Sequence, residues 1–292
     1  MRLNGKYYEI MIRITKFRCN SFEELSYLVW AGKACVVIDP GFDCEEEFDA
    51  LEKSLKDNEL KPSAILLTHA HPDHIYGVHR LCEKFGIPVY VNRGEEVTIG
   101  ALHTLCFNAG HPDIEDFSQR IKWVEDGDRI FVADGAATIL RGGDGNATAE
   151  NSRNGGISEG ETDDVVPGMH GGLEFMVLST PGHTAGGVCY LCREFSTQDE
   201  ATGHQDSKCA ESGSHGGWKV LFSGDTLFAG CIGRSDLPGG DYTALMQSIF
   251  TKLLPLDGNI DVLPGHGPST TIADERTKNP FLQPFNEPYE DE

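Results

Sequence analysis

The sequence predicts an α/β fold in which β-sheets are packed between layers of helices. Three observations lead to this prediction. Short apolar runs typical of strands cluster near the start of the chain, later strand-like runs alternate with helical segments, and several runs end in a glycine turn followed by a histidine or an aspartate. A length of 292 residues suits one large domain, so we expect a single domain over residues 1–292.

The predicted strands are short runs rich in β-branched and aromatic residues, bounded by Gly, Pro or polar residues. Ala34–Asp39 is typical, because Pro40 and Gly41 follow it directly. Pro62 bounds the apolar run Ser63–Leu67 in the same way. In chain order, we expect strands at Tyr8–Lys16, Ser26–Trp30, Ala34–Asp39, Ser63–Leu67, Pro88–Asn92, Ile130–Ala133, Leu173–Ser179, Gly187–Cys192, Lys219–Ser223 and Ile260–Leu263.

The predicted helices have apolar residues spaced by three and four positions. In Glu45–Lys56, for example, Phe48, Leu51 and Leu55 share one face. Such a face has to be buried, so each helix is expected to cover a sheet. We expect helices at Glu45–Lys56, Ile75–Phe85, Glu95–Phe107 and Asp241–Leu254, and a short terminal helix that begins at Thr271.

Two stretches depart from this alternation of strands and helices. Residues 135–172 contain ten glycines and no aromatic side chain, and residues 194–217 are mainly Ser, Gly, Asp, Glu and Gln. Because such stretches bury too little apolar surface to offset the entropy of ordering, we expect flexible insertions there. The direction of the neighbouring strands places both insertions at the pole away from the predicted site. Residues 284–292 form an acidic tail.

The composition argues against several classes of partner. A net charge of −22 disfavours nucleic acid and anionic membrane surfaces, both of which attract basic residues. No apolar run approaches the ~20 residues of a membrane-spanning helix, and the first residues lack the apolar core of an export signal. Nine cysteines without a framework spacing suit a reducing compartment, so we expect a cytoplasmic protein. The residues indicate no oligomeric state.

One short segment contains four side chains that commonly bind metals. His69, His71, Asp73 and His74 follow the strand-like run Ser63–Leu67. Alternation along this strand would put His69 and His71 on one face, close enough to bind one cation. A proline then ends the strand, so that Asp73 and His74 approach from another side. Imidazole suits zinc and iron, and a carboxylate extends the choice to manganese.

Three later strands end in a shared layout. The apolar runs that end near residues 179, 223 and 263 are each followed by a glycine turn and one residue able to bind a metal: His183, Asp225 and His266. Open α/β sheets place their sites at the carboxyl ends of strands. A single His or Asp in such a place is usually structural, but three with the same layout predict a shared site.

The order of these residues resembles the pattern of the metallo-β-lactamase-fold hydrolase superfamily. In chain order the matching residues are His69, His71, Asp73, His74, His183, Asp225 and His266. The resemblance implies an αββα sandwich, in which two mixed β-sheets pack between helical layers. It also implies two divalent metal ions bridged by Asp225. One ion would be bound by His69, His71 and His183, and the other by Asp73, His74 and His266.

The same resemblance implies roles around the two ions. Zinc is the expected metal, with iron or manganese as alternatives, and a hydroxide that bridges the ions would attack the substrate. Asp39 matches a carboxylate that the superfamily usually places behind the metal ligands. Thr68 and Thr184 are further candidates for orienting the imidazoles. Asp73 is the candidate catalytic residue, because it could accept or relay a proton.

Further segments resemble one branch of the superfamily. Residues 228–241, 264–271 and 279–281 are similar to the short bacterial glyoxalase-II-like branch, whose members resemble hydroxyacylglutathione hydrolases. The implied substrate is a small molecule, either a thioester of the hydroxyacylglutathione type or a related small acyl ester. Arg234 is the candidate anchor for a substrate carboxylate, with an ion pair to Asp236 as its alternative role. Glyoxalase II proper also has a helical C-terminal domain that binds glutathione, and only 26 residues follow the last predicted ligand, so the resemblance does not extend to glutathione itself.

A second interpretation of the same pattern is an iron-dependent persulfide dioxygenase. That branch shares the His-x-His-x-Asp-His run, and by analogy it would bind one iron through His69, His183 and Asp225, with positions open for oxygen. One iron with oxygen uptake would favour the dioxygenase, whereas two metals with thioester cleavage would favour the hydrolase. In both cases we expect the groove walls to come from Glu95–Gln119 and Phe228–Gly240.

Overall fold

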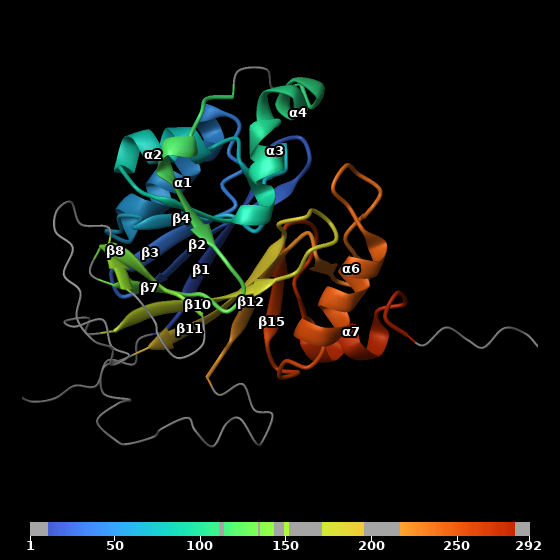
Figure 1. The fold of residues 1–292 in the computed structure, drawn as a ribbon. Helices are drawn as coiled ribbons and strands as arrows, with labels where there is room; N and C mark the ends of the chain where they lie inside the picture. The colour runs from blue at the N-terminus through green and yellow to red at the C-terminus, as the bar shows by residue number, and fades with distance from the viewer. Residues whose placement is uncertain are drawn as a thin grey trace, which may run out of the picture.

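Two large β-sheets lie face to face in the computed structural model, and helices cover the outer face of each sheet (Figure 1). The structure describes residues 11–110, 114–133, 135–142, 149–151, 171–195 and 217–283. Both sheets contain parallel and antiparallel neighbours. The predicted αββα sandwich of two mixed sheets is therefore confirmed.

The first sheet has six strands in the order β1-β2-β3-β4-β5-β6. Its first three strands are antiparallel, and β3 to β6 run parallel. Parallel neighbours need crossover connections, which the helices of this half provide. The strands are β1 Arg13–Cys19, β2 Glu24–Ala31, β3 Ala34–Ile38, β4 Ala64–Leu66, β5 Val89–Asn92 and β6 Ile121–Val124. The helices are α1 Glu45–Asp57, α2 Val78–Phe85, α3 Glu96–Gly100 and α4 Leu102–Asn108, with short 3₁₀ turns at Pro72–His74, Arg93–Glu95 and Ser118–Arg120.

The second sheet has eight strands in the order β16-β15-β12-β11-β10-β7-β8-β9. Only β12 and β15 pair in parallel, and α6 with a π-helical segment connects them. The strands are β7 Arg129–Ala133, β8 Ala136–Leu140, β9 Ala149–Asn151, β10 Gly172–Ser179, β11 Val188–Phe195, β12 Val220–Gly224, β15 Asp261–Pro264 and β16 Thr270–Thr271. A separate hairpin joins β13 Leu227–Phe228 to β14 Cys231–Ile232, and the helical segments are α6 Tyr242–Ser248, the π-helical Ile249–Leu253 and α7 Ile272–Lys278.

Alternation along the strands divides the core into layers. In β3, Val36 faces the second sheet, while Val37 faces the helices of the first half. In β11, Tyr190 lies between the sheets and Leu191 packs toward α6 and α7. Each large side chain removed from water in this way contributes about 1.5–3 kcal/mol. The buried faces thus fix both the strand register and the ends of the strands, where the predicted site lies.

Several predicted boundaries are wrong. The helix expected at Glu95–Phe107 is two short helices, α3 and α4, after a 3₁₀ turn, and the helix expected at Asp241–Leu254 becomes π-helical from Ile249. Strands β6 and β8 were not predicted. Strand β8 also corrects the insertion expected at residues 135–172, because it pairs along its whole length with β7 and buries most of its side chains. Residues 152–170 and 196–216, within the two predicted insertions, lie outside the described residues, as does the predicted tail 284–292.

The strand ends that flank these gaps lie away from the predicted site. Strand β11 begins near His183 and is antiparallel to β12, which ends next to Asp225. Phe195 and Gly217 therefore flank their gap at the opposite pole of the sheet, as the strand directions predicted. Among the described residues, none of the helices combines the length and the apolar character needed to span a membrane.

Candidate metal centre

The loop 67–74 after β4 holds four of the predicted ligands. The prediction that His69 and His71 lie on a strand face is wrong, because β4 ends at Leu66, where both neighbouring strands stop pairing with it. The loop is held instead by backbone hydrogen bonds, including Val188 N–H to the Thr68 carbonyl at 2.8 Å, which ties it to the second sheet. The imidazoles of His69 and His71 still meet, with ring centroids 4.8 Å apart.

The other three predicted ligands come from the second sheet, at the ends of β10, β12 and β15. A glycine precedes each of them, and the glycines at 224 and 265 leave space for the site. A β-carbon at Gly265 would overlap Asp225 Oδ1 and His74, and one at Gly224 would overlap Thr68. Gly224 also has φ +47°, a conformation that glycine adopts without strain. The glycine turns seen in the sequence are therefore needed for the close approach of the two sheets.

The first group of three, His69, His71 and His183, is made of imidazoles alone. His71 Nδ1 lies 2.9 Å from His183 Nε2, and the His69 and His183 ring centroids are 4.9 Å apart. The Nδ1–H of His183 donates to the Arg234 carbonyl at 2.7 Å, which leaves its Nε2 lone pair directed at the group. This three-histidine group therefore presents imidazole nitrogens to a common point.

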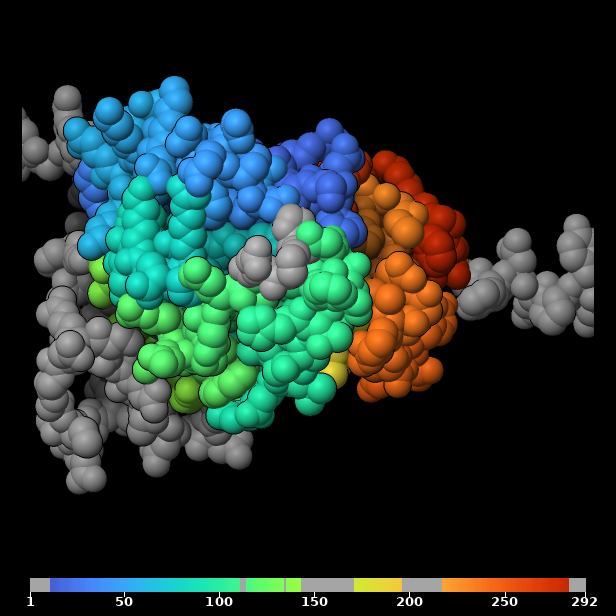
Figure 2. All heavy atoms as spheres, turned by 90° about the horizontal axis from the view of Figure 1, so that it is seen from above, coloured from blue at the N-terminus to red at the C-terminus, as the bar shows by residue number. Residues whose placement is uncertain are grey.

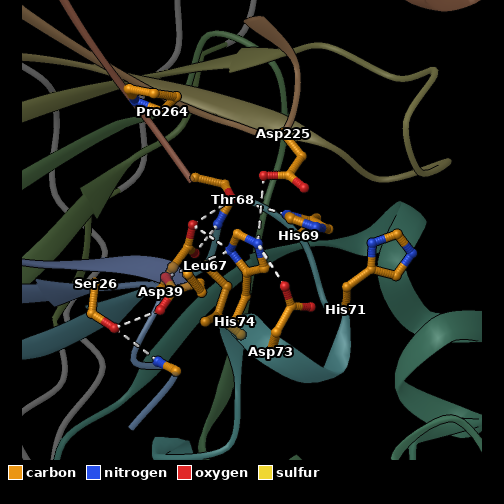
Figure 3. A network of polar contacts seen from close by, with 12 residues as sticks. Ser26, Asp39, Leu67, Thr68, His69, His71, Asp73, His74, Asp225 and Pro264 are labelled. Atoms are coloured by element: carbon orange, nitrogen blue, oxygen red, sulfur yellow. Dashed lines mark hydrogen bonds and ion pairs between the residues drawn. The ribbon is translucent and has the colours of Figure 1, made fainter. Parts of the chain in front are cut away.

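The second group, Asp73, His74 and His266, contains a carboxylate. Asp73 Oδ2 lies 3.2 Å from His266 Nε2 and 3.7 Å from His74 Nε2. Asp225 lies between the groups, as Figure 3 shows for its contact with His74. Its carboxylate oxygens are 3.5 Å from His74 Nε2, 3.7 Å from His266 Nε2 and 3.6 Å from His183 Nε2. The structure thus brings all seven predicted ligands together, with Asp225 in contact with both groups.

Buried polar atoms in this cluster fit the binding of a cation. His69 Nε2, His74 Nε2 and Asp225 Oδ1 are buried and have no hydrogen-bond partner among the described residues. A buried polar atom without a partner costs about 1–3 kcal/mol, so three together need compensation. Divalent metal ions coordinated by imidazole nitrogens and carboxylate oxygens would supply it. The residues present therefore fit two such ions.

Protonation differs between the two groups. Burial, reinforced by neighbouring imidazoles, lowers the pKa of His69 well below its usual value and that of His71 to about 3. Burial also opposes charge on His74 and His266, but Asp73, Asp225 and, for His74, Asp39 outweigh it and raise the pKa of both imidazoles. The same imidazoles lower the pKa of Asp73 although burial opposes this. Neutral imidazoles are thus favoured at His69 and His71, and an ion pair is favoured among Asp73, His74 and His266.

A buried chain of hydrogen bonds orients the ligands from behind (Figure 3). Asp39 accepts from the Thr68 N–H at 2.7 Å, from the Thr68 hydroxyl at 2.6 Å and from His74 Nδ1–H at 3.1 Å. The Thr68 hydroxyl in turn lies 3.1 Å from His69 Nδ1, so it accepts from that ring. Asp39 therefore fixes Nε2 of both His69 and His74 toward the site. Asp39 holds φ +44°, a strained conformation that is common at functional sites.

Two buried carboxyl groups were missed in the sequence. Glu24 is fully buried, accepts a hydrogen bond from Ser26 at 2.8 Å and lies 3.9 Å from His74 Nδ1; burial raises the pKa of its carboxyl well above the usual range. Glu95 accepts hydrogen bonds from the Thr184 hydroxyl and from the backbone N–H groups of Ala70 and Gly186. Thr184 was expected to orient an imidazole, but its hydroxyl donates to Glu95. Glu95 thus connects the loop of His69 and His71 with the loop of His183.

An open pocket of about 720 Å³ lies over the cluster. Both predicted wall segments contribute to it: Val97, Ala101 and Leu105 from the first, and Leu237 and Pro238 from the second. Figure 2 shows these two parts of the chain, coloured green and orange, adjoining on the surface. Arg234 also lines the pocket, but its guanidinium donates to both oxygens of Asp236, at 2.8 and 2.9 Å, which is the alternative role considered for it.

The chain matches a protein family over most of its described residues. Residues 22–195 match the family model described as the metallo-beta-lactamase superfamily. The chain is 30% identical to the hydroxyacylglutathione hydrolase GloC of Haemophilus influenzae, over 90% of this chain and 94% of that protein. It is 31% identical to the probable metallo-hydrolase YqgX of Bacillus subtilis, over 89% of this chain and 93% of that one.

One solved structure adds a metal to this comparison. The crystal structure of TTHA1623 in a di-iron-bound form has a TM-score of 0.58 and 29% sequence identity, and the match covers 92% of this chain and 100% of that chain. The similarity thus extends over the two sheets and the loops that hold the seven residues.

Proposed function

This chain belongs to the metallo-beta-lactamase superfamily, and from this premise we propose that it is a metal-dependent hydrolase that cleaves a thioester of the hydroxyacylglutathione type or a related small acyl ester. One observation carries the proposal. Two groups of three ligands share Asp225 at the base of an open pocket, which is the layout that hydrolysis between two metal ions requires. The name of the relative from Haemophilus influenzae supports the thioester class.

Two divalent ions fit the ligands that the chain provides. In our proposal, one ion is held by the three-histidine group and the other by Asp73, His74 and His266, with Asp225 binding both. Zinc suits this mixture of imidazole and carboxylate, and iron or manganese would also be accepted. When bound, such ions lower the pKa of a bound water and polarise the substrate carbonyl.

The residues of the chain complete the reaction. Attack by water oxygen on the thioester carbon breaks the C–S bond and gives a carboxylic acid and a thiol. Asp73 is proposed to accept or relay the proton, because its carboxylate faces the pocket beside His266 Nε2, 3.2 Å away. A thiol has an ordinary pKa of about 8.5, so the leaving group needs little help from an acid. Asp39 and Thr68 hold the imidazoles of His69 and His74 in position.

Arg234 is proposed to bind the substrate at the rim of the pocket. Its side chain is exposed, and its ion pair with Asp236 lies in water, where such pairs contribute about 0–1 kcal/mol. A substrate carboxylate can therefore replace Asp236 at little cost. Arg234 also contributes through its carbonyl, which fixes His183.

The cytoplasm is the proposed compartment. All eight cysteines within the described residues are free thiols, and burial raises the pKa of the six buried ones. Unpaired buried thiols are typical of proteins in reducing compartments.

A combined assay tests the proposed function. Protein loaded with zinc, iron or manganese would be assayed for hydrolysis of S-lactoylglutathione and of acyl thioesters of simple thiols, and separately for oxygen uptake with a persulfide. We expect hydrolysis that is lost on chelation and restored by the metal. Oxygen uptake with one iron per chain and no thioester cleavage would support the dioxygenase instead and overturn the proposal.

A further inference from the structure

The segment that contains α3 and α4 has two apolar faces. Leu102 and Cys106 point into the core of the first half, where they are 6% and 0% exposed. A second set, spaced by four residues, is Val97, Ala101, Leu105 and Ala109. These positions span the junction of α3 and α4, and all four line one pocket, so they form a stripe distinct from the core face. We call these four residues the α3–α4 stripe.

The outer end of the stripe is not covered by the other described residues. Val97, in α3, is 83% exposed, and an exposed apolar side chain beside a pocket is a candidate contact surface. All four residues of the stripe line the pocket over the metal centre, together with His71, His183, Asp225 and His266. Leu237 and Pro238 line the same pocket from the other wall segment. An apolar surface is thus continuous with the predicted ligands.

Charge in this pocket does not suit a ligand with several anionic groups. Arg234 is the one Lys or Arg side chain among the described residues that line it, and its guanidinium is engaged by Asp236. The carboxylates of Asp73 and Asp225 face the same space. A carrier with several carboxylates, such as glutathione, would find a single cation for them, beside the two acidic side chains. An uncharged apolar chain would instead cover the stripe and release water from it.

We propose that the α3–α4 stripe is the binding site for the acyl chain of the substrate, and that the preferred substrates are thioesters of unbranched apolar acyl groups. This inference rests on the proposed function, since it assumes that the scissile carbonyl lies over the metal centre. The acyl chain is the natural occupant, because biological thiol carriers are rich in amides and charges, whereas the stripe offers no polar group. The small side chain of Ala101, at the middle of the stripe, leaves the room that a chain needs.

The dependence of kcat/KM on the length of the acyl chain tests this proposal directly. Metal-loaded enzyme would be assayed with acetyl, butanoyl, hexanoyl and octanoyl thioesters of N-acetylcysteamine, a small uncharged thiol. Partial burial of each methylene should raise kcat/KM about threefold, so that the octanoyl compound exceeds the acetyl compound by more than about 100-fold. Ala101→Phe should lower the octanoyl-to-acetyl ratio more than about tenfold by filling the stripe. His103→Phe, an exposed change on the same helix outside the pocket, should leave the ratio unchanged.

Failure of this inference differs from failure of the proposed function. A flat or falling series, an unchanged ratio in Ala101→Phe, or a preference for S-lactoylglutathione over all apolar thioesters would overturn the stripe as acyl site while hydrolysis stands. Absence of hydrolysis with every thioester would overturn the proposed function. In that case, binding of the octyl thioether of N-acetylcysteamine would be measured by titration calorimetry for the parent protein and for Ala101→Phe. Binding that is about tenfold weaker in Ala101→Phe supports an apolar-chain site. Equal binding to the two proteins, or no binding to either, contradicts it.

Discussion

The two groups of ligands in this site are built alike but differ in charge. Each combines residues of the 67–74 loop with a residue from the end of a strand of the second sheet. In the three-histidine group, burial lowers the pKa of His69 and His71, which favours their neutral forms. In the other group, Asp73 lies beside His74 and His266, whose pKa is raised. Protons on these imidazoles balance the negative charge of the carboxylates, as a bound metal ion would.

The difference teaches that similar geometry need not give similar metal binding. A divalent ion at the three-histidine group would displace no protons from His69 and His71. The Asp73 group has to exchange protons for the ion, which makes its affinity depend on pH. Asp225 contacts both groups, so it couples two positions of unlike character. The following changes separate these contributions, beginning with the largest expected effect.

Replacing Asp225, which both groups share, should have the largest effect on hydrolysis and metal content. Asp225→Ala takes one ligand from each group, and thioester hydrolysis should fall by more than about 100-fold, beyond the ~10–100-fold that loss of an outer hydrogen-bond partner costs. The measurement is kcat/KM together with metal content. Asp49→Ala, an exposed aspartate on α1, serves as the control and should behave as the parent protein. Activity within threefold of the parent in Asp225→Ala would show that the two groups do not act together.

Removing the support behind the ligands should have a smaller effect on both groups. Asp39→Asn weakens the acceptor for His74 and for the Thr68 hydroxyl that orients His69. Metal affinity and hydrolysis should each fall about 10–100-fold, while the far-ultraviolet circular dichroism stays that of the parent. An Asp39→Asn protein with full activity and full metal content would mean that Asp39 is only a structural polar group.

Acid should empty the Asp73 group before the three-histidine group. Imidazoles with a raised pKa become protonated at a higher pH than ordinary imidazoles. As the pH falls, protons therefore displace a metal ion from the Asp73 group first. His69 and His71, with a lowered pKa, remain unprotonated over the same range. From about pH 8 to about pH 5.5, across the ordinary imidazole pKa of ~6.5, metal content should fall from two ions to one. Metal content at each pH would be measured by elemental analysis after dialysis. Simultaneous loss of both ions would contradict this order.

The smallest effect is expected from the carboxylate that joins the two loops of the three-histidine group. Glu95→Gln keeps the size of the side chain but replaces one of the oxygens that accept from Thr184, Ala70 and Gly186. Hydrolysis should fall less than about tenfold, and stability in urea should fall by about 1–3 kcal/mol because one buried donor loses its acceptor. Glu96→Gln, exposed at the next position, is the matched control. A larger loss of activity than in Asp39→Asn would place Glu95 among the principal supports of the site.

Much of the site could be predicted because its ligands follow a local rule. His183, Asp225 and His266 each come directly after an apolar strand and a glycine, and Gly224 and Gly265 are needed for close approach. Glu24 and Glu95 follow no such rule. Their burial depends on Ser26, Thr184 and backbone groups from other segments, and in an acidic chain a single glutamate has no distinguishing pattern.

The errors in the fold have a similar origin. The sequence predicts that the strand alternation continues through His69 and His71 up to Pro72, but the pairing of β4 with β3 and β5 ends at Leu66. Strand β8 was included in a glycine-rich insertion, although pairing with β7 stabilises it. In both cases a neighbouring strand, and not the local sequence, determines the boundary.

Metal content measured on ligand variants tests the central claim most directly. Protein reconstituted with zinc and freed of excess metal would be analysed as the parent chain, as His71→Ala and as Asp73→Ala. Two cations held by seven converging side chains predict two zinc ions per parent chain and one in each variant. One ion per parent chain, retained in Asp73→Ala and lost in His71→Ala, would contradict the binuclear centre.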